Sequence, residues 1–154
     1  YYRYKLNQMI DNINFRSFKK GDYEVCCNWW EWWWKRGGRD PVGRAFLPKN
    51  ERCFVIEKNG VAVACYFLFI MEPHIVGWTT YLVSNPEYKE KDRRELIKRL
   101  ILSVEKEAEK IGIMQLFTIC GNKQMSSIHE SIDWMLIPVQ NEGFKYLTNN
   151  FIKK

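Results

Sequence analysis

The stretch from Gly77 to Gly112 most constrains what this chain can fold into. It begins with a β-prone run, residues 78–83, and continues through a polar loop that contains Pro86. A long segment follows in which apolar residues recur every third or fourth position, and Gly112 closes it as expected for the C-cap of an amphipathic helix. An apolar run, 113–119, comes next. The stretch therefore predicts a strand–loop–helix–strand unit whose helix starts where an anion can bind.

The residues before this unit predict an antiparallel meander. The runs 53–57 and 61–71 are apolar and are separated by Asn59-Gly60, a hairpin signal because both residues tolerate a positive φ. Residues 13–18 alternate in polarity, as expected of a further strand. The predicted fold class is therefore α+β: a mixed central sheet with an antiparallel N-terminal meander, one parallel βαβ step and flanking helices.

Three helices are expected around this sheet. Asp22 is a good N-cap for a helix over residues 23–35, and Gly37-Gly38 ends it. The central helix is expected to start at residue 91 or 92. A short helix is expected over 126–134, and residues 144–152 are expected to end the chain as one or two strands.

Length and composition predict a single domain with an anionic partner. A chain of 154 residues normally forms one core, which we place over residues 13–154, with residues 1–12 as an N-terminal extension or a cloning remnant. The net charge of +6 suits a nucleotide, a nucleic acid or an anionic cofactor. The five cysteines form no CxxC pair, so we expect no metal site and a reducing, cytoplasmic location. No apolar run has the ~20 residues of a membrane span, so no membrane partner is expected.

Several local features resemble the GNAT superfamily of acyl-CoA-dependent N-acyltransferases. The resemblance covers roughly residue 13 to the end of the chain. A looser similarity links the Trp-rich first helix and Leu47-Pro48 to phage-encoded GNAT-like proteins. The features that carry the main resemblance are Phe15 to Phe18 with Gly21-Asp22, the Asn59-Gly60 turn, Val83 with Pro86 before the long helix, Asn122, and Asn141 to Phe144.

The resemblance implies acetyl-CoA as cosubstrate and an amine as acceptor. Aligned on Pro86, Lys89 takes the arginine position of the family's acyl-CoA motif, and Glu90, Asp92 and Arg94 take its glycine positions. Side chains would then contact the phosphates in place of a glycine-lined backbone. The alternative is that this charged segment is only a solvated helix start. The implied cofactor-binding residues are Leu82 and Val83, through backbone groups, and Lys89, Lys91, Arg93, Arg94 and Asn122.

Acyl transfer to an amine also needs a base and an acid. Glu72 and His74 are expected in the turn before the strand 76–83, and histidine is the side chain that most often acts as a general base. Tyr81 lies on that strand. Glu72, His74 and Tyr81 are therefore the candidate catalytic residues, with plain solvent exposure of His74 as the alternative.

Five tryptophans stand in the six positions 29–34, more than one face of a helix can bury. We expect one or two of them to line a cleft, where a planar acceptor can stack. The alternative is core packing together with a protein interface. The candidate substrate-binding residues are Trp30, Trp33, Trp34 and Arg44.

Two functions follow from these patterns. The first is an N-acetyltransferase that transfers an acetyl group from acetyl-CoA to a primary amine. The second is a GNAT-like module without catalysis that binds nucleic acid or protein, which the residues at the motif's glycine positions favour. The sequence leaves open whether the protein is a dimer.

Overall fold

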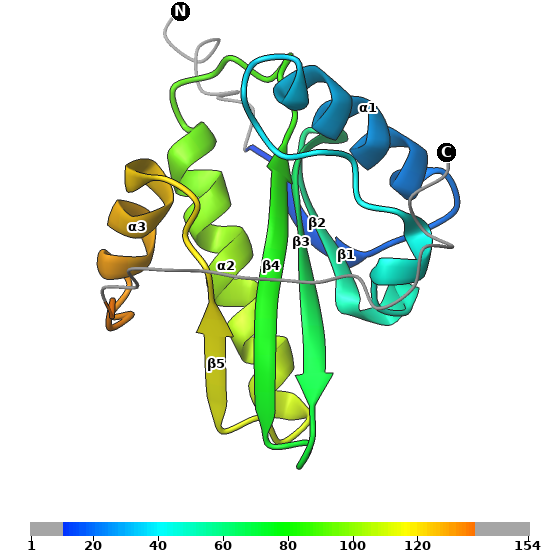
Figure 1. Ribbon diagram of the computed structural model, residues 1–154. Coiled ribbons are helices and arrows are strands. Elements are labelled where there is room, and N and C mark those ends of the chain that lie inside the picture. The colour runs from blue at the N-terminus through cyan, green and yellow to red at the C-terminus, as the bar shows by residue number, and fades with distance from the viewer. Residues whose placement is uncertain (1–10, 138–154) are drawn as a thin grey trace, which may run out of the picture.

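The structure, a computed structural model, describes residues 11–137 of the chain (Figure 1). These residues form one five-stranded sheet in the order β1-β2-β3-β4-β5. The first four strands are antiparallel neighbours, and β5 runs parallel to β4. This arrangement confirms the predicted mixed sheet with one parallel step. The strands are β1 (Ile13–Ser17), β2 (Cys53–Lys58), β3 (Val61–Met71), β4 (Val76–Ser84) and β5 (Gln115–Thr118).

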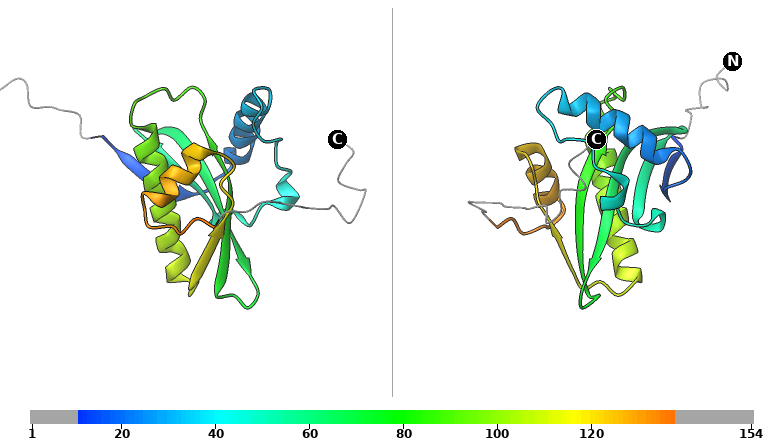
Figure 2. Two further views of the ribbon diagram at one scale, coloured as in Figure 1. Left: turned by 60° about the vertical axis from the view of Figure 1, so that its left-hand side comes forward. Right: turned by 45° about the vertical axis from the view of Figure 1, so that its right-hand side comes forward.

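Helices cover both faces of the sheet (Figures 1 and 2). Helix α1 (Asp22–Trp34) lies on one face, and α2 (Arg93–Lys110) and α3 (Lys123–Glu130) lie on the other. Two short 3-10 turns, η1 (Arg44–Phe46) and η2 (Asn50–Arg52), interrupt the loop after α1. Within residues 11–137, no helix combines the length and the apolar character needed to cross a bilayer.

Each face of the sheet has its own apolar core, because successive side chains of a strand point to opposite faces. On β3, Tyr66 and Leu68 pack with the apolar stripe of α2, whereas Cys65 and Phe67 pack with α1. The spacing of the apolar residues in α2 predicted this stripe, and its buried members are Leu96, Ile97, Leu100, Ile101, Val104 and Ala108.

The start of α1 differs from the prediction. Gly21, with a φ of 94°, takes the N-cap position, and Asp22 is the first helical residue. The Asp22 carboxylate instead accepts hydrogen bonds from the Arg16 guanidinium, at 2.6 Å, and from the Lys19 backbone N–H, at 2.7 Å. Burial raises the pKa of Asp22, but the hydrogen bonds from Arg16 and Lys19 outweigh it and the net pKa is lowered. Asp22 therefore ties β1 to α1.

The third helix is displaced from its predicted range of 126–134. It starts at Lys123, because the Asn122 side chain accepts a hydrogen bond from the Met125 N–H at 2.9 Å and so caps it. It ends at Glu130. The preceding strand, β5, covers only part of the predicted run 113–119. The strands expected over 144–152 lie outside the described residues.

Candidate active site

The most distinctive feature of the sheet is the separation of β4 from β5. The two strands pair only along Val76–Thr79 and Gln115–Thr118. Beyond this point β4 continues to Ser84, while the chain leaves β5 for α3 (Figure 1). We call the point after Thr79 the fork, residues 76–79 the paired half of β4, and residues 80–84 its open half. Within the described chain no strand pairs with that edge of the open half, so its peptide groups, apart from the Ser84 carbonyl that the Trp33 indole binds, can pair with an extended ligand.

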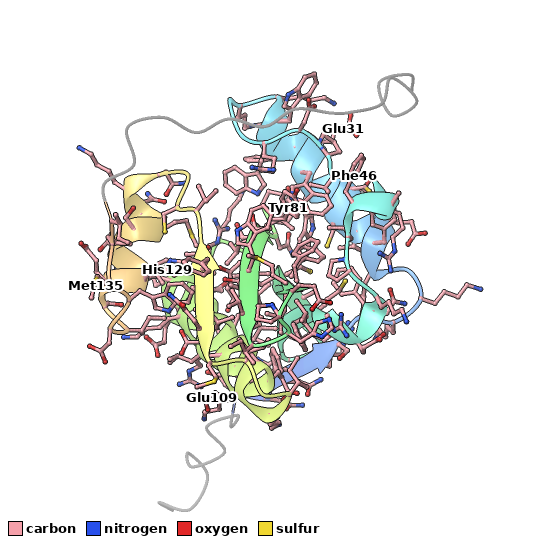
Figure 3. The ribbon with its side chains drawn as sticks, turned by 60° about the horizontal axis from the view of Figure 1, so that its bottom comes forward. Glu31, Phe46, Tyr81, Glu109, His129 and Met135 are labelled. Atoms are coloured by element: carbon pink, nitrogen blue, oxygen red, sulfur yellow. The ribbon has the colours of Figure 1, made fainter. Side chains whose placement is uncertain are left out.

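A β-bulge marks the start of the open half. Cys65 pairs with Val83 and Phe67 with Thr80, so Tyr81 and Leu82 together oppose one residue of β3. Tyr81 has a φ of 60°, in the left-handed region that an aromatic residue rarely adopts. Bulges of this kind redirect side chains and are common beside active sites. Here the bulge places Tyr81 on the α1 face (Figure 3). Its ring centroid lies 6.5 Å from that of Trp78.

Three hydroxyl groups meet on the other face at the fork. The Tyr66 hydroxyl donates to Thr79 Oγ1 at 2.9 Å and lies 3.1 Å from Thr118 Oγ1. Burial raises the pKa of Tyr66 to about 12, although the hydrogen bonds to the two threonines oppose it. The phenol therefore stays neutral. Its hydroxyl links β3, β4 and β5 at the last residue pair of β4 and β5, Thr79 with Thr118. This cluster was not predicted from the sequence. Its only signal in the sequence is that Thr79 and Thr118 follow apolar residues of their strands.

A basic cavity of about 310 Å³ lies where α2 begins, on the side of α3. Arg94 donates from Nη2 to Ser127 Oγ at 3.0 Å, and Arg93 donates to the Asn85 carbonyl at 3.3 Å. Both guanidiniums are thus held beside the cavity. The cavity brings together three of the predicted phosphate-binding residues with side chains from α3. Its lining consists of Lys91, Arg93, Arg94, Ile97, Gln124 and Ile128.

The backbone at this helix start also suits an anion. The first hydrogen bond of the helix runs from the Leu96 N–H to the Asp92 carbonyl. The N–H groups of Arg94 and Glu95 have no acceptor among residues 11–137. Unpaired N–H groups at the positive end of an 18-residue helix favour phosphate.

Asp92, which takes one of the motif's glycine positions, does not exclude an anion from this helix start. The Asp92 carboxylate accepts from Lys58 Nζ at 2.6 Å and from the Tyr88 hydroxyl at 2.7 Å. These hydrogen bonds lower the pKa of Asp92. Lys58 from β2, which also pairs with Asp11 at 3.0 Å, therefore offsets part of the Asp92 charge. Glu90 and Lys89 are both exposed in the loop before α2, and Lys89 is not among the residues that line the cavity.

The remaining predicted cofactor contacts lie near the fork and on α3. Leu82 and Val83 belong to the open half of β4, as predicted. Asn122 caps α3, the helix that contributes Gln124 and Ile128 to the cavity. The geometry assigns the Asn122 side chain a structural task, and its contact with a cofactor stays a prediction.

The predicted catalytic residues are not gathered in one place. Glu72 and His74 pair with one another, and both are exposed in the turn between β3 and β4. Tyr81 lies at the fork. Five residues of strand, at about 3.3 Å each, separate Val76 from Tyr81, so the turn is at the opposite end of β4. The role of Glu72 and His74 as a base therefore stays a prediction without geometric support from this arrangement.

The predicted substrate residues also separate. Trp30 is only 2% exposed and stacks on Phe67 with ring centroids 5.7 Å apart, so it is a core residue. Trp33 donates from its indole N–H to the Ser84 carbonyl at 2.8 Å and thus reaches the open half of β4. Trp34 is 51% exposed. Arg44 donates to Pro48 and Asn50 within its own loop.

A cysteine and a histidine meet at the end of β5. Cys120 Sγ lies 3.5 Å from His129 Nδ1, and that same nitrogen lies 2.8 Å from the Met125 carbonyl. The carbonyl accepts, so Nδ1 carries the proton and cannot deprotonate the thiol. Burial lowers the pKa of His129 and raises that of Cys120. The pair is consequently a neutral thiol beside a neutral imidazole.

Comparison with known proteins supports the fold. No protein-family model and no curated protein matches the sequence. Among solved structures, an aminoglycoside N-acetyltransferase in complex with CoA superposes with a TM-score of 0.63 at 15% identity, over 88% of this chain and 95% of that one. A GCN5-related N-acetyltransferase from Ralstonia eutropha gives a TM-score of 0.59 at 16% identity, over 88% and 99%.

A third match is N-acetylglutamate synthase from Neisseria gonorrhoeae, with a TM-score of 0.62 at 19% identity. It involves 77% of this chain but only 28% of the synthase. At these identities the comparisons establish architecture alone. The described chain has the fold of the GNAT acetyltransferases. This confirms, at the level of the fold, the resemblance seen in the sequence.

Proposed function

We propose that this protein is an N-acetyltransferase that transfers an acetyl group from acetyl-CoA to a primary amine. The observation that carries the proposal is the cavity at the start of α2, where Lys91, Arg93 and Arg94 meet unpaired backbone N–H groups. On the same sheet the open half of β4 offers unpaired peptide groups. A charged end and a hydrogen-bonding strand edge together suit a ligand with phosphates at one end and amide groups along its length.

Each part of acetyl-CoA has residues that fit it. The phosphates would bind the N–H groups of Arg94 and Glu95 and the surrounding cations, with Lys89 adding charge from its exposed loop. The pantetheine amides would bind backbone groups of Leu82 and Val83 in the open half of β4. The ion pair of Asp92 with Lys58 reduces the electrostatic repulsion between Asp92 and a bound phosphate.

The transfer itself demands little of the protein. The amine nitrogen forms a bond to the thioester carbonyl carbon, the C–S bond breaks, one proton leaves the amine, and one proton reaches the thiolate of CoA. The chain's contribution is to orient the two substrates and to polarise the carbonyl through N–H groups of the open half. Tyr81 is the predicted catalytic residue at the fork, and Glu72 and His74 are candidate bases at the far end of β4.

Calorimetric titration with acetyl-CoA and with CoA tests the proposal, followed by a thiol-release assay with primary amines. We expect binding of both ligands and amine-dependent release of CoA thiol. Absence of binding at millimolar acetyl-CoA would falsify the proposal.

One observation favours the alternative of a nucleic-acid-binding module. Trp34 is half exposed near the end of α1, on a chain with a net charge of +6. An exposed indole on a basic protein can stack on an unpaired base. Salt-dependent binding of a single-stranded oligonucleotide that is lost in Trp34→Ala, combined with no binding of acetyl-CoA, would support the module instead.

A further inference from the structure

An aromatic cluster lies at the fork on the α1 face of the sheet. Phe69 of β3 and Trp78 and Tyr81 of β4 have ring centroids 5.8, 5.9 and 6.5 Å apart. All three side chains are half-buried. The basic cavity lies on the opposite face, between α2 and α3. A ligand held along the open edge of β4 can therefore be reached by a second substrate from the α1 face.

A cation lies on this cluster. The guanidinium carbon of Arg39 is 4.7 Å from the centroid of the Tyr81 ring, within the range of a cation–π contact. Arg39 forms no ion pair with any described carboxylate, including that of its neighbour Asp40. A guanidinium stacked by its face keeps its N–H edge for an oxyanion. The site thus presents a positive charge whose partner the described residues do not supply.

The C-terminus of α1 builds this position. The Gly38 N–H donates to the Trp33 carbonyl at 2.9 Å, and a Cβ at Gly38 would lie 2.9 Å from the same oxygen. Gly37 has a φ of 83°, which lets the chain reverse. The Trp33 indole in turn binds the Ser84 carbonyl of β4. Trp33 therefore fixes both the turn at Gly37-Gly38 and the distance of this turn from β4. Arg39, which follows Gly38, can then reach Tyr81.

We propose that the acceptor is an amine that carries a carboxylate beside an aromatic or other apolar body, and that Arg39 binds this carboxylate. The assignment rests on the proposed N-acetyltransferase function. The aromatic cluster takes the apolar body, and the Arg39 guanidinium takes the carboxylate through paired N–H donors. The acceptor amine then lies between them, facing the fork.

Electrostatics favour an acceptor with this anionic group over a simple amine. An unmodified amine arrives as a cation and meets the Arg39 charge, which repels it. A carboxylate on the same molecule converts that repulsion into attraction. Polycationic amines are disfavoured for the same reason.

Matched substrate pairs test the inference. Phenylalanine and phenethylamine, and tryptophan and tryptamine, differ only by the carboxylate. In the thiol-release assay we expect kcat/KM to be about 10- to 100-fold higher for the acid of each pair, the range of a charge-assisted contact. Arg39→Gln should remove this preference by raising KM for the acids and by lowering KM for the two amines, whose repulsion it relieves, while the KM of acetyl-CoA stays unchanged. Arg39→Lys should restore part of it.

Arg36 provides the matched control. It stacks 3.6 Å over the Trp32 ring and donates to the Trp32 carbonyl. Arg36→Gln should keep the wild-type preference. Equal turnover of acids and amines, or an equal loss for both in Arg39→Gln, overturns the inference. Binding of acetyl-CoA without acetylation of either acid also overturns it, whereas absence of acetyl-CoA binding refutes the proposed function itself.

Discussion

The two halves of β4 use the same strand for different purposes. The paired half, residues 76–79, is hydrogen-bonded on both sides, and Thr79 joins the hydroxyl cluster of Tyr66 and Thr118. The open half, residues 80–84, begins with a bulge and pairs on one side only. The first half holds the sheet together, and the second keeps peptide groups for a ligand. Substitutions near each half should therefore separate stability from binding.

The largest effect is expected at the cavity beyond the open half. Arg93→Glu combined with Arg94→Glu replaces two cations at the start of α2 with anions. The affinity for acetyl-CoA should fall by about 100-fold, or about 2.7 kcal/mol, with little change in Tm. Calorimetry at two salt concentrations measures this, and the remaining affinity should depend less on salt. Arg99→Glu, an exposed position further along α2, is the control. An unchanged affinity in the double variant would mean that the phosphates bind elsewhere.

Substitutions around the paired half of β4 should lower the free energy of unfolding and leave ligand binding almost unchanged. Tyr66→Phe removes the hydroxyl that Thr79 and Thr118 share, so the buried Thr79 oxygen and the half-buried Thr118 oxygen each lose a partner. The free energy of unfolding should fall by about 1–2 kcal/mol. The affinity of the folded protein for acetyl-CoA should change less than about 3-fold. Urea unfolding and calorimetry measure both quantities. Thr118→Val should repeat the loss and Thr118→Ser should avoid most of it; a collapse of binding without loss of stability would contradict this division.

Added side-chain volume in the paired half of β4 should lower stability by less than the loss of the Tyr66 hydroxyl. A Cβ added at Gly77 would lie 2.8 Å from Leu116 Cδ2 and 3.2 Å from Leu68 Cδ1. Gly77→Ala should cost about 1 kcal/mol of stability, because leucine side chains must shift to admit it. Gly121→Ala, where no atom lies within 4 Å, should stay within about 0.5 kcal/mol of wild type. Equal Tm values for the two variants would show that the β4–β5 junction is loosely packed.

A change of similar size at Asn122 distinguishes capping from binding. Asn122→Ala removes the acceptor for the Met125 N–H and should cost about 1 kcal/mol. Asn122→Asp keeps the cap while adding a negative charge. If Asn122 also contacts a phosphate of CoA, only the Asp variant should combine near-normal stability with weaker binding of acetyl-CoA. Thermal melts and calorimetry on both variants decide the point, and normal binding in Asn122→Asp restricts Asn122 to the cap.

Hydrophobic periodicity and turn chemistry predicted the strands and helices of residues 11–137, with α3 displaced by a few residues. The apolar stripe of α2 predicted its buried face, and Asn59-Gly60 predicted the β2–β3 hairpin, because these signals are local. Capping was less predictable. Asp22 and Asn122 both have side chains that can cap a helix, and Asn122 does cap α3. The Asp22 carboxylate forms an ion pair with the Arg16 guanidinium instead. Such competition depends on contacts between distant residues.

The sequence could predict the candidate site only where its residues belong to one continuous segment. Arg93 and Arg94 adjoin the helix start that the sequence marks, so their gathering at one cavity followed from local structure. The contact of Arg39 with Tyr81 and the ion pair of Asp92 with Lys58 join residues more than thirty positions apart. The bulge at Tyr81 likewise follows from its pairing with β3. No periodicity encodes these relations.

The last predicted effect is a pH dependence at the end of β5, where the chain leaves the fork for α3. His129 is buried against Trp134, and its Nε2 has no hydrogen-bond partner among the described residues. Burial lowers its pKa, so below about pH 6.5 the unfolded chain binds a proton that the folded protein resists. Stability should therefore fall as pH drops from 6.5 to 5, with a slope of at most about 1.4 kcal/mol per pH unit.

Urea unfolding at pH 7.0, 6.0 and 5.5 measures this slope. His129→Phe should flatten it, whereas His74→Gln should keep it, because the His74 side chain is exposed in the β3–β4 turn. The window lies above the range in which most carboxylates titrate, so acid unfolding does not mask the effect. A slope that persists in His129→Phe would place the responsible group elsewhere, and one that vanishes in His74→Gln would assign it to the turn at the far end of β4.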